Sequence, residues 1–138
     1  MRPTSARASA AALVCAAAAG LAGSAGADAG PLVRGPASVV SGRVVVFHAR
    51  GFNAGSTLGL VLSPADRGPC CAIRLVSTFL VSSAGRATLR FRMPLQYKSC
   101  IPSSPPRCHK VRWARGERAV LTVTGYLQQA EATTVVER

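Results

Sequence analysis

The sequence predicts an all-β protein, an antiparallel β-sandwich built from roughly seven to eight short strands. Runs of β-branched, aromatic and leucine residues recur at intervals of about 8–12 residues, and Gly, Pro, Ser and Asn separate them. The clearest run covers residues 86–93, where Ala87, Leu89, Phe91 and Met93 alternate with polar side chains. No segment after the leader shows the helical repeat of about 3.6 residues. A sandwich is therefore favoured over a helical bundle.

The first 27 residues have the features of a secretory signal peptide. Arg2 and Arg7 precede an apolar run over residues 10–21, and Ala25–Gly26–Ala27 fits a small-residue cleavage site. The apolar run is shorter than the ~20 residues that a transmembrane helix needs. We therefore expect an exported protein, located in the extracellular space or the cell envelope, without a transmembrane segment.

The segment after the leader predicts a linker and then one domain. Residues 28–36 hold two prolines and two glycines, which indicates a linker before a domain over residues 37–138. Residues 37–40 predict the first strand. The apolar runs 43–49 and 58–63 flank a turn rich in Gly and Asn, so they are predicted to form an antiparallel pair.

The second half of the chain continues the same pattern. Further strands are predicted at residues 73–81, 86–93, 111–114, 118–124 and 132–136. Pro94 ends the second of these, because proline cannot donate to a strand ladder. Residues 95–110, rich in proline, are predicted to be a long connection.

Four cysteines follow the leader, and in an exported domain they predict disulfide bonds among Cys70, Cys71, Cys100 and Cys108. A bond between adjacent cysteines would be strained, because neighbouring Cα atoms lie at ~3.8 Å. In an up-and-down sandwich, the loops after residues 62 and 93 emerge at the same end. The favoured connectivity therefore joins these two loops by two cross-links. Zinc binding by these cysteines and His109 is not favoured, since the spacing does not fit.

The mature chain is strongly basic, because loss of the leader leaves 15 of the 17 Lys and Arg residues against five acidic ones. Two groups are candidates for binding anions: Arg86, Arg90 and Arg92 on one strand face, and Arg107, Lys110, Arg112, Arg115 and Arg118 around Trp113. Trp113 is a candidate for stacking on a sugar, although a single Trp in a sandwich is favoured as a core residue. An ordinary solvated surface and a compositional bias toward Arg are the alternatives for the charge.

No arrangement of catalytic residues is visible. The mature carboxylates do not form a pair suited to acid–base work, and there is no Gly-x-Ser-x-Gly motif. His48 lies within an apolar strand, and His109 follows a cysteine in a basic loop. The sequence therefore predicts a protein without catalytic activity, metal or cofactor.

Several turn-and-strand motifs resemble the bacterial secreted immunoglobulin-like domains: Gly42-x-Val44-x-Val46, then Gly51-Phe52-x-x-Gly55-Ser56, residues 83–88, and Pro94. The resemblance covers roughly residues 37–95 and implies an immunoglobulin-like sandwich. The neocarzinostatin-type apoproteins are similar sandwiches with two disulfides. This chain departs from them in its adjacent Cys70 and Cys71 and in the Cys100-x7-Cys108 spacing.

These inferences lead to three hypotheses for function. The first is a non-catalytic secreted binding module, or an envelope-associated one, with a basic surface for anionic wall polymer, an anionic glycan or another extracellular partner. The second, implied by the resemblance, is a small-molecule carrier of the chromophore type. The third is an enzyme. Nucleic acid is not expected as a partner of an exported protein, and the oligomeric state stays open.

Overall fold

A computed structural model of the chain describes residues 30–67 and 71–137, and these residues form ten strands. The predicted signal peptide over residues 1–27 and Cys70 lie outside the described residues. No helix among residues 30–67 and 71–137 is long and apolar enough to cross a membrane. The all-β prediction is confirmed, with more strands than the sequence indicated.

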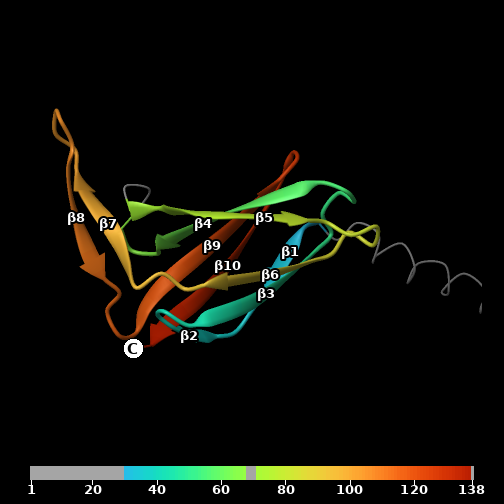
Figure 1. The fold of residues 1–138 in the computed structure, drawn as a ribbon, viewed down its shortest axis with the longest axis horizontal. Helices are drawn as coiled ribbons and strands as arrows, with labels where there is room; N and C mark the ends of the chain where they lie inside the picture. Colours follow the sequence, from blue (N-terminus) through green and yellow to red (C-terminus); the bar gives the residue numbers. More distant parts are fainter. Residues whose placement is uncertain (1–29, 68–70, 138) are drawn as a thin grey trace, which may run out of the picture.

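The strands form two layers and a separate hairpin (Figure 1). The three-stranded sheet has the order β1 (Leu32–Arg34), β3 (Val44–Arg50), β6 (Ala87–Arg92). The five-stranded sheet has the order β2 (Ser38–Val40), β10 (Gln128–Glu137), β9 (Glu117–Gly125), β4 (Thr57–Pro64), β5 (Ile73–Leu80). The hairpin consists of β7 (Gln96–Ile101) and β8 (Arg107–Arg112).

The strand order is that of an immunoglobulin-like sandwich, as predicted. The first part of the described chain divides between the layers, because β1 pairs with β3 in one sheet and β2 pairs with β10 in the other. The β2–β10 pair is parallel, whereas every other pair among the described strands is antiparallel. The hairpin is inserted between β6 and β9, the strands that in this fold lie in opposite sheets.

The predicted pairing of residues 43–49 with 58–63 is wrong. These segments are β3 and β4, which lie in different sheets even though Gly51 and Gly55 take positive φ and reverse the chain between them. Each strand has one apolar face. The two faces are buried against each other across the core, which removes more apolar surface from water than an edge-to-edge pair would.

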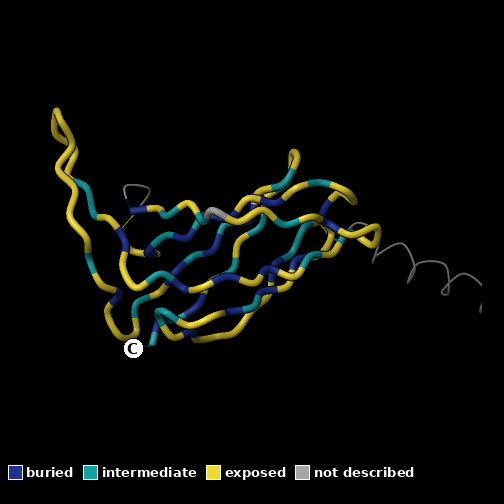
Figure 2. Tube along the Cα trace, viewed as in Figure 1, coloured by how far each residue is buried: buried dark blue, intermediate teal, exposed yellow. Residues whose placement is uncertain are grey.

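The core fills the space between the layers (Figure 2). Leu58, Leu60 and Leu62 of β4 and Leu121 of β9 are at most 1% exposed. From the opposite sheet, Phe47 and Phe91 stack with ring centroids 5.9 Å apart. The predicted alternation in β6 is confirmed, since Leu89 and Phe91 are buried while Arg90 and Arg92 are exposed.

The linker prediction for residues 28–36 is wrong at Leu32–Arg34, which form β1. Val33 is buried in the core, and β1 pairs with β3 over its whole length. The chain then crosses to the other sheet at Pro36, whose carbonyl accepts a hydrogen bond from Thr134 Oγ1 at 2.9 Å. The prolines and glycines mark this crossing between sheets.

The predicted cross-links between loops are also wrong, because Cys100 and Cys108 bond to each other within the β7–β8 hairpin. Residues 95–110, predicted to be a connection, contain most of this hairpin. Antiparallel register places the two cysteines directly opposite, with Cα atoms 4.0 Å apart. Cys71 is buried and lies two residues before β5.

Candidate functional site

The outer face of the three-stranded sheet carries a dense group of basic side chains. Register places Arg34 beside His48 and His48 beside Thr88, while Arg90 and Arg92 pair with Val46 and Val44. All of these polar residues are exposed. We call this surface the cationic sheet face and define it by Arg34, Arg50, Arg86, Arg90 and Arg92.

Three of these arginines were predicted from the sequence as one face of a strand, and the structure places Arg86, Arg90 and Arg92 together as expected. Arg34 and Arg50 were not predicted. Arg34 falls in the segment taken for a linker, and Arg50 ends β3. The alternation of Val44, Val46, His48 and Arg50 marks an outward face. Only the pairing of β3 with β1 and β6 joins the three strands into one surface.

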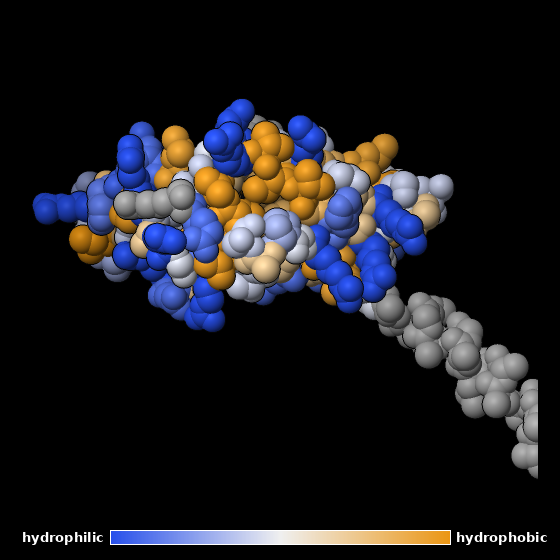
Figure 3. Space-filling view, turned by 90° about the horizontal axis from the view of Figure 1, so that it is seen from below, coloured by the Kyte–Doolittle hydropathy of each residue, from blue (hydrophilic) through white to orange (hydrophobic). Residues whose placement is uncertain are grey.

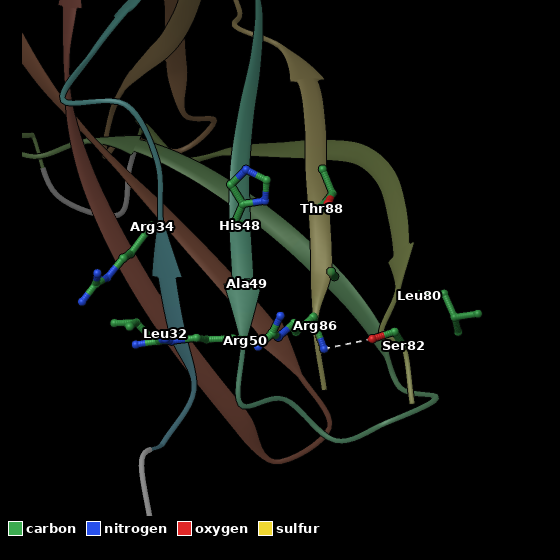
Figure 4. A pocket seen from close by; sticks show the side chains of 10 residues that line it. Leu32, Arg34, His48, Ala49, Arg50, Leu80, Ser82, Arg86 and Thr88 are labelled. Carbon is green, nitrogen blue, oxygen red and sulfur yellow. Dashed lines mark hydrogen bonds between the residues drawn. The ribbon is translucent and has the colours of Figure 1, made fainter. Parts of the chain in front are cut away.

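A cavity of about 830 Å³ lies at the end of this face where β1 and β6 begin and β3 ends. Figure 4 shows that Arg50 extends toward Leu32 and that Arg86 lies beside β3. His48 and Thr88 also line the cavity, together with Leu80, which ends β5, and Ser82 from the chain between β5 and β6. The Ser82 hydroxyl accepts a hydrogen bond from the Arg86 backbone N–H at 3.3 Å, which fixes the start of β6. The cavity therefore offers guanidinium, imidazole and hydroxyl groups together.

The described part of this face has no carboxylate. Asp66 pairs with Arg118 at 3.2 Å, Glu137 pairs with Arg115 at 3.6 Å, and Glu117 lies 4.0 Å from Arg67. Glu131 belongs to β10 in the five-stranded sheet. Arg92 is held in place by donating a hydrogen bond from Nη1 to the Gly42 carbonyl at 2.7 Å. The positive charge of the sheet face is therefore not compensated by the acidic residues that the structure describes.

The second predicted group divides into two parts. Arg107, Lys110 and Arg112 are exposed on β8. Arg115 and Arg118 instead form the ion pairs with Glu137 and Asp66, which makes them poorer candidates for binding an external anion. Figure 3 shows an apolar patch near the middle of one face of the molecule, with hydrophilic side chains around it and toward both ends.

Trp113 is a core residue, as favoured from the sequence, and the alternative stacking role is wrong, because the side chain is 1% exposed and cannot reach a ligand on the surface. Its ring meets Tyr97 edge to face, with centroids 4.7 Å apart. Tyr97 donates a hydrogen bond to Glu117 Oε1 at 2.8 Å, and Glu117 Oε2 accepts one from the Ala114 N–H at 2.8 Å. This cluster fixes the base of the hairpin to the sandwich.

Burial raises the pKa of Tyr97 to about 12, and the hydrogen bond to Glu117 and its negative charge act in the same direction. Arg67 lies over the Tyr97 ring, 5.9 Å from its centroid, and partly opposes this shift of the Tyr97 pKa. The loop after β4 therefore does approach the hairpin, as the predicted topology required. The contact is made by Arg67 over the Tyr97 ring, whereas the prediction was a disulfide. The Tyr97 hydroxyl is protonated and serves as a structural donor.

Residues 30–67 and 71–137 contain no group of three His, Cys, Asp or Glu side chains that could hold a metal ion. Cys100 and Cys108 are bonded to each other, so their sulfur atoms are not available as thiolate ligands. His48 lies among arginines on the sheet face, and His109 lies opposite Ser99 on the hairpin. The arrangement suits recognition of negative charge.

No protein-family model and no curated protein sequence matches this chain. Among solved structures, it is similar to a superoxide reductase (neelaredoxin) from Ignicoccus hospitalis, with 13% identity and a TM-score of 0.36 over 79% of this chain and 81% of that one. It is also similar to the sulfur carrier protein SoxY from Chlorobium limicola f thiosulfatophilum, with 15% identity and a TM-score of 0.34 over 80% and 76% of the two chains. The fold assignment above rests on strand order, and no activity follows from these similarities.

Proposed function

We propose that this protein is a non-catalytic extracellular binding module whose cationic sheet face holds an anionic polymer, such as a wall polymer or an acidic glycan. One observation carries the proposal: five arginines and a cavity lie together on one sheet face. The described residues of that face include no carboxylate. The signal peptide expected from the sequence would deliver the protein to the compartment where such polymers occur.

Arginine suits this task. Its planar guanidinium group donates two parallel hydrogen bonds to a carboxylate or a phosphate, and it keeps its charge at any physiological pH. The hydroxyl groups of Ser82 and Thr88 at the cavity add neutral partners. A ligand with carboxylate or phosphate groups would therefore be both attracted and oriented here.

The spacing of the arginines favours a polymer over a single ion. Arg90 and Arg92 are two residues apart on one strand, so their Cα atoms lie about 7 Å apart, and Arg86 extends the row by about 13 Å. A ligand with negative charges repeated at intervals of several ångströms could contact the whole row. Many weak contacts in series would then provide the affinity.

The carrier hypothesis has less support. A carrier of the neocarzinostatin type would be expected to have an apolar cavity between the sheets, whereas the cavity of about 830 Å³ lies at the end of the three-stranded sheet, and its lining combines leucine and alanine side chains with three arginines. Its volume lies within the range of small-molecule sites. If the protein carries a small molecule in this cavity, that molecule should be anionic.

Retention of the purified protein on immobilised polygalacturonate and polyphosphate tests the proposal. The variant Arg50→Glu/Arg86→Glu should bind at least about ten-fold more weakly, because two attractive contacts become repulsive. For the effect of net charge, the single variant Arg86→Glu is compared with Arg74→Glu, which changes the charge equally at an exposed arginine on β5 of the other sheet; Arg74→Glu should change binding by less than about three-fold, and Arg86→Glu should change it more. Equal loss in both single variants would show that only net charge matters, and retention that does not fall with added salt would refute the charge mechanism.

A further inference from the structure

The β7–β8 hairpin extends beyond the sandwich as an arm (Figure 1). Only its base is packed: Tyr97 is buried and Val111 is half-buried, whereas residues 101–110 are all exposed (Figure 2). An isolated two-stranded hairpin is marginally stable at best in water. Burial of apolar surface therefore does not explain why this hairpin extends outside the core.

The charges of the arm are of one sign. Lys98 lies directly opposite Lys110, and Arg112 follows on the same face opposite Gln96. Arg107 and His109 lie on the other face. There is no acidic residue between Leu95 and Gly116. Like charges directly opposite each other destabilise a strand pair, so an external anion that contacts both lysines would relieve the repulsion.

The arm is also fixed in shape. The Cys100–Cys108 bond closes its outer end, and the contacts of Tyr97 with Trp113 and Glu117 attach its base. A ligand that binds Lys98, Lys110 and Arg112 would therefore meet side chains on an ordered backbone. Such pre-organisation lowers the entropic penalty of binding.

The arm and the cavity of the sheet face lie toward opposite ends of the long axis (Figure 1). The length of β6 alone separates Arg86 from the chain that leads into β7, which amounts to roughly 20 Å at ~3.3 Å per residue. This separation exceeds the Debye length of about 8 Å at physiological salt. Anions bound at the cavity and on the arm would therefore not repel each other strongly, whereas an anion at Arg92, four residues before the start of β7, would lie near the base of the arm.

From these observations we infer that the hairpin arm is a second polyanion-binding element, and that the protein joins two polymer segments by holding one at each end. The inference rests on the proposed function and deepens it, because it turns a binding module into a cross-linker of polymers with repeated carboxylate or phosphate groups. Linking two weak sites in one rigid body also raises the avidity for a long chain.

Short and long probes separate the two sites. A galacturonate or phosphate oligomer too short to span the molecule should bind with two molecules per chain in calorimetry, and the long polymers should form light-scattering complexes. The two polymer types distinguish a preference for carboxylate from one for phosphate. The hairpin variant Lys98→Gln/Lys110→Gln/Arg112→Gln should bind one oligomer per chain. Its mixture with the long polymer should not form light-scattering complexes. Arg50→Glu/Arg86→Glu should behave likewise through loss of the other site.

The outcomes are distinct. One oligomer per chain in the wild type, with the hairpin variant unchanged, would overturn the inference and leave the proposed function standing. No binding of either polymer would overturn both. Scattering that persists in the hairpin variant would show that cross-linking comes from association between protein molecules, which also refutes the inference. Circular dichroism and mass mapping of the Cys100–Cys108 bond verify that the variants are folded.

Discussion

Replacing Glu117 by Ala should destabilise the protein far more than an ordinary change on a β-sheet surface. Glu117 accepts a hydrogen bond from the Tyr97 hydroxyl and another from the Ala114 N–H, both at 2.8 Å. Its side chain is 14% exposed and lies 4.0 Å from Arg67. One substitution therefore removes three interactions that connect the hairpin, the loop after β4 and the start of β9.

The magnitude follows from the surroundings of each partner. Tyr97 is 2% exposed, so its hydroxyl would be left buried without an acceptor, which costs about 1–3 kcal/mol. Ala114 is exposed, so water can replace the carboxylate and the loss there is about 0.5–1 kcal/mol. The contact with the half-exposed Arg67 adds at most about 0.5 kcal/mol. We expect a total loss of about 1.5–4.5 kcal/mol in the free energy of unfolding.

A double-mutant cycle with Tyr97→Phe tests the reasoning. Urea unfolding can be followed by the fluorescence of Trp113, the only Trp, whose ring contacts Tyr97. Tyr97→Phe should cost about 1–2 kcal/mol in the wild type and close to nothing in the Glu117→Ala background, where it removes the unpaired hydroxyl. Glu131→Ala, at an exposed carboxylate on β10, is the control and should cost less than about 0.5 kcal/mol. Equal costs of Tyr97→Phe in both backgrounds would refute the proposed coupling.

Two further predictions concern the same scaffold. The pKa of Tyr97 is raised from 10.0 to about 12, so the folded protein disfavours the ionised phenol. The stabilisation of the folded state by the neutral Tyr97 is therefore fully present below pH 10 and is lost as the pH rises to about 12. Unfolding free energies measured across this window should fall by about 2–3 kcal/mol more in the wild type than in Tyr97→Phe, and Tyr126→Phe, at an exposed tyrosine, should behave as the wild type. At the β9–β10 turn, Leu127 has φ of 56° and is 88% exposed, so Leu127→Gly should raise stability by about 0.5–1 kcal/mol. Tyr126→Gly is the comparison, since Tyr126 does not have a positive φ; a gain there, or a loss at Leu127, would contradict the strain argument.

Part of the candidate site was predictable from local pattern. The alternation of Arg86–Met93 places Arg90 and Arg92 opposite the buried Leu89 and Phe91, and the structure confirms this. A period of two requires only the geometry of one strand, so no knowledge of neighbouring strands was needed. The same holds for the leucines of β4.

Features that depend on which strands become partners could not be predicted from local sequence patterns. The Lys98–Lys110 and Cys100–Cys108 pairs exist because β7 and β8 align in one register. These two strands were not predicted, because the segment that contains them is rich in proline. Arg34 joins the sheet face only because β1 pairs with β3. Trp113 is surrounded by basic residues in the sequence but buried against Tyr97 in space.

The order of residues alone determined that this chain is all-β, that its arginines alternate with core residues along β6, and that its positive charge far exceeds its negative charge. These properties follow from side-chain chemistry and the period of a single strand. The tertiary structure decided which strands became neighbours, and therefore which arginines meet, which carboxylates are already paired and which cysteines bond. Those outcomes depend on burying two apolar faces against each other, a condition that residues distant in the sequence satisfy together.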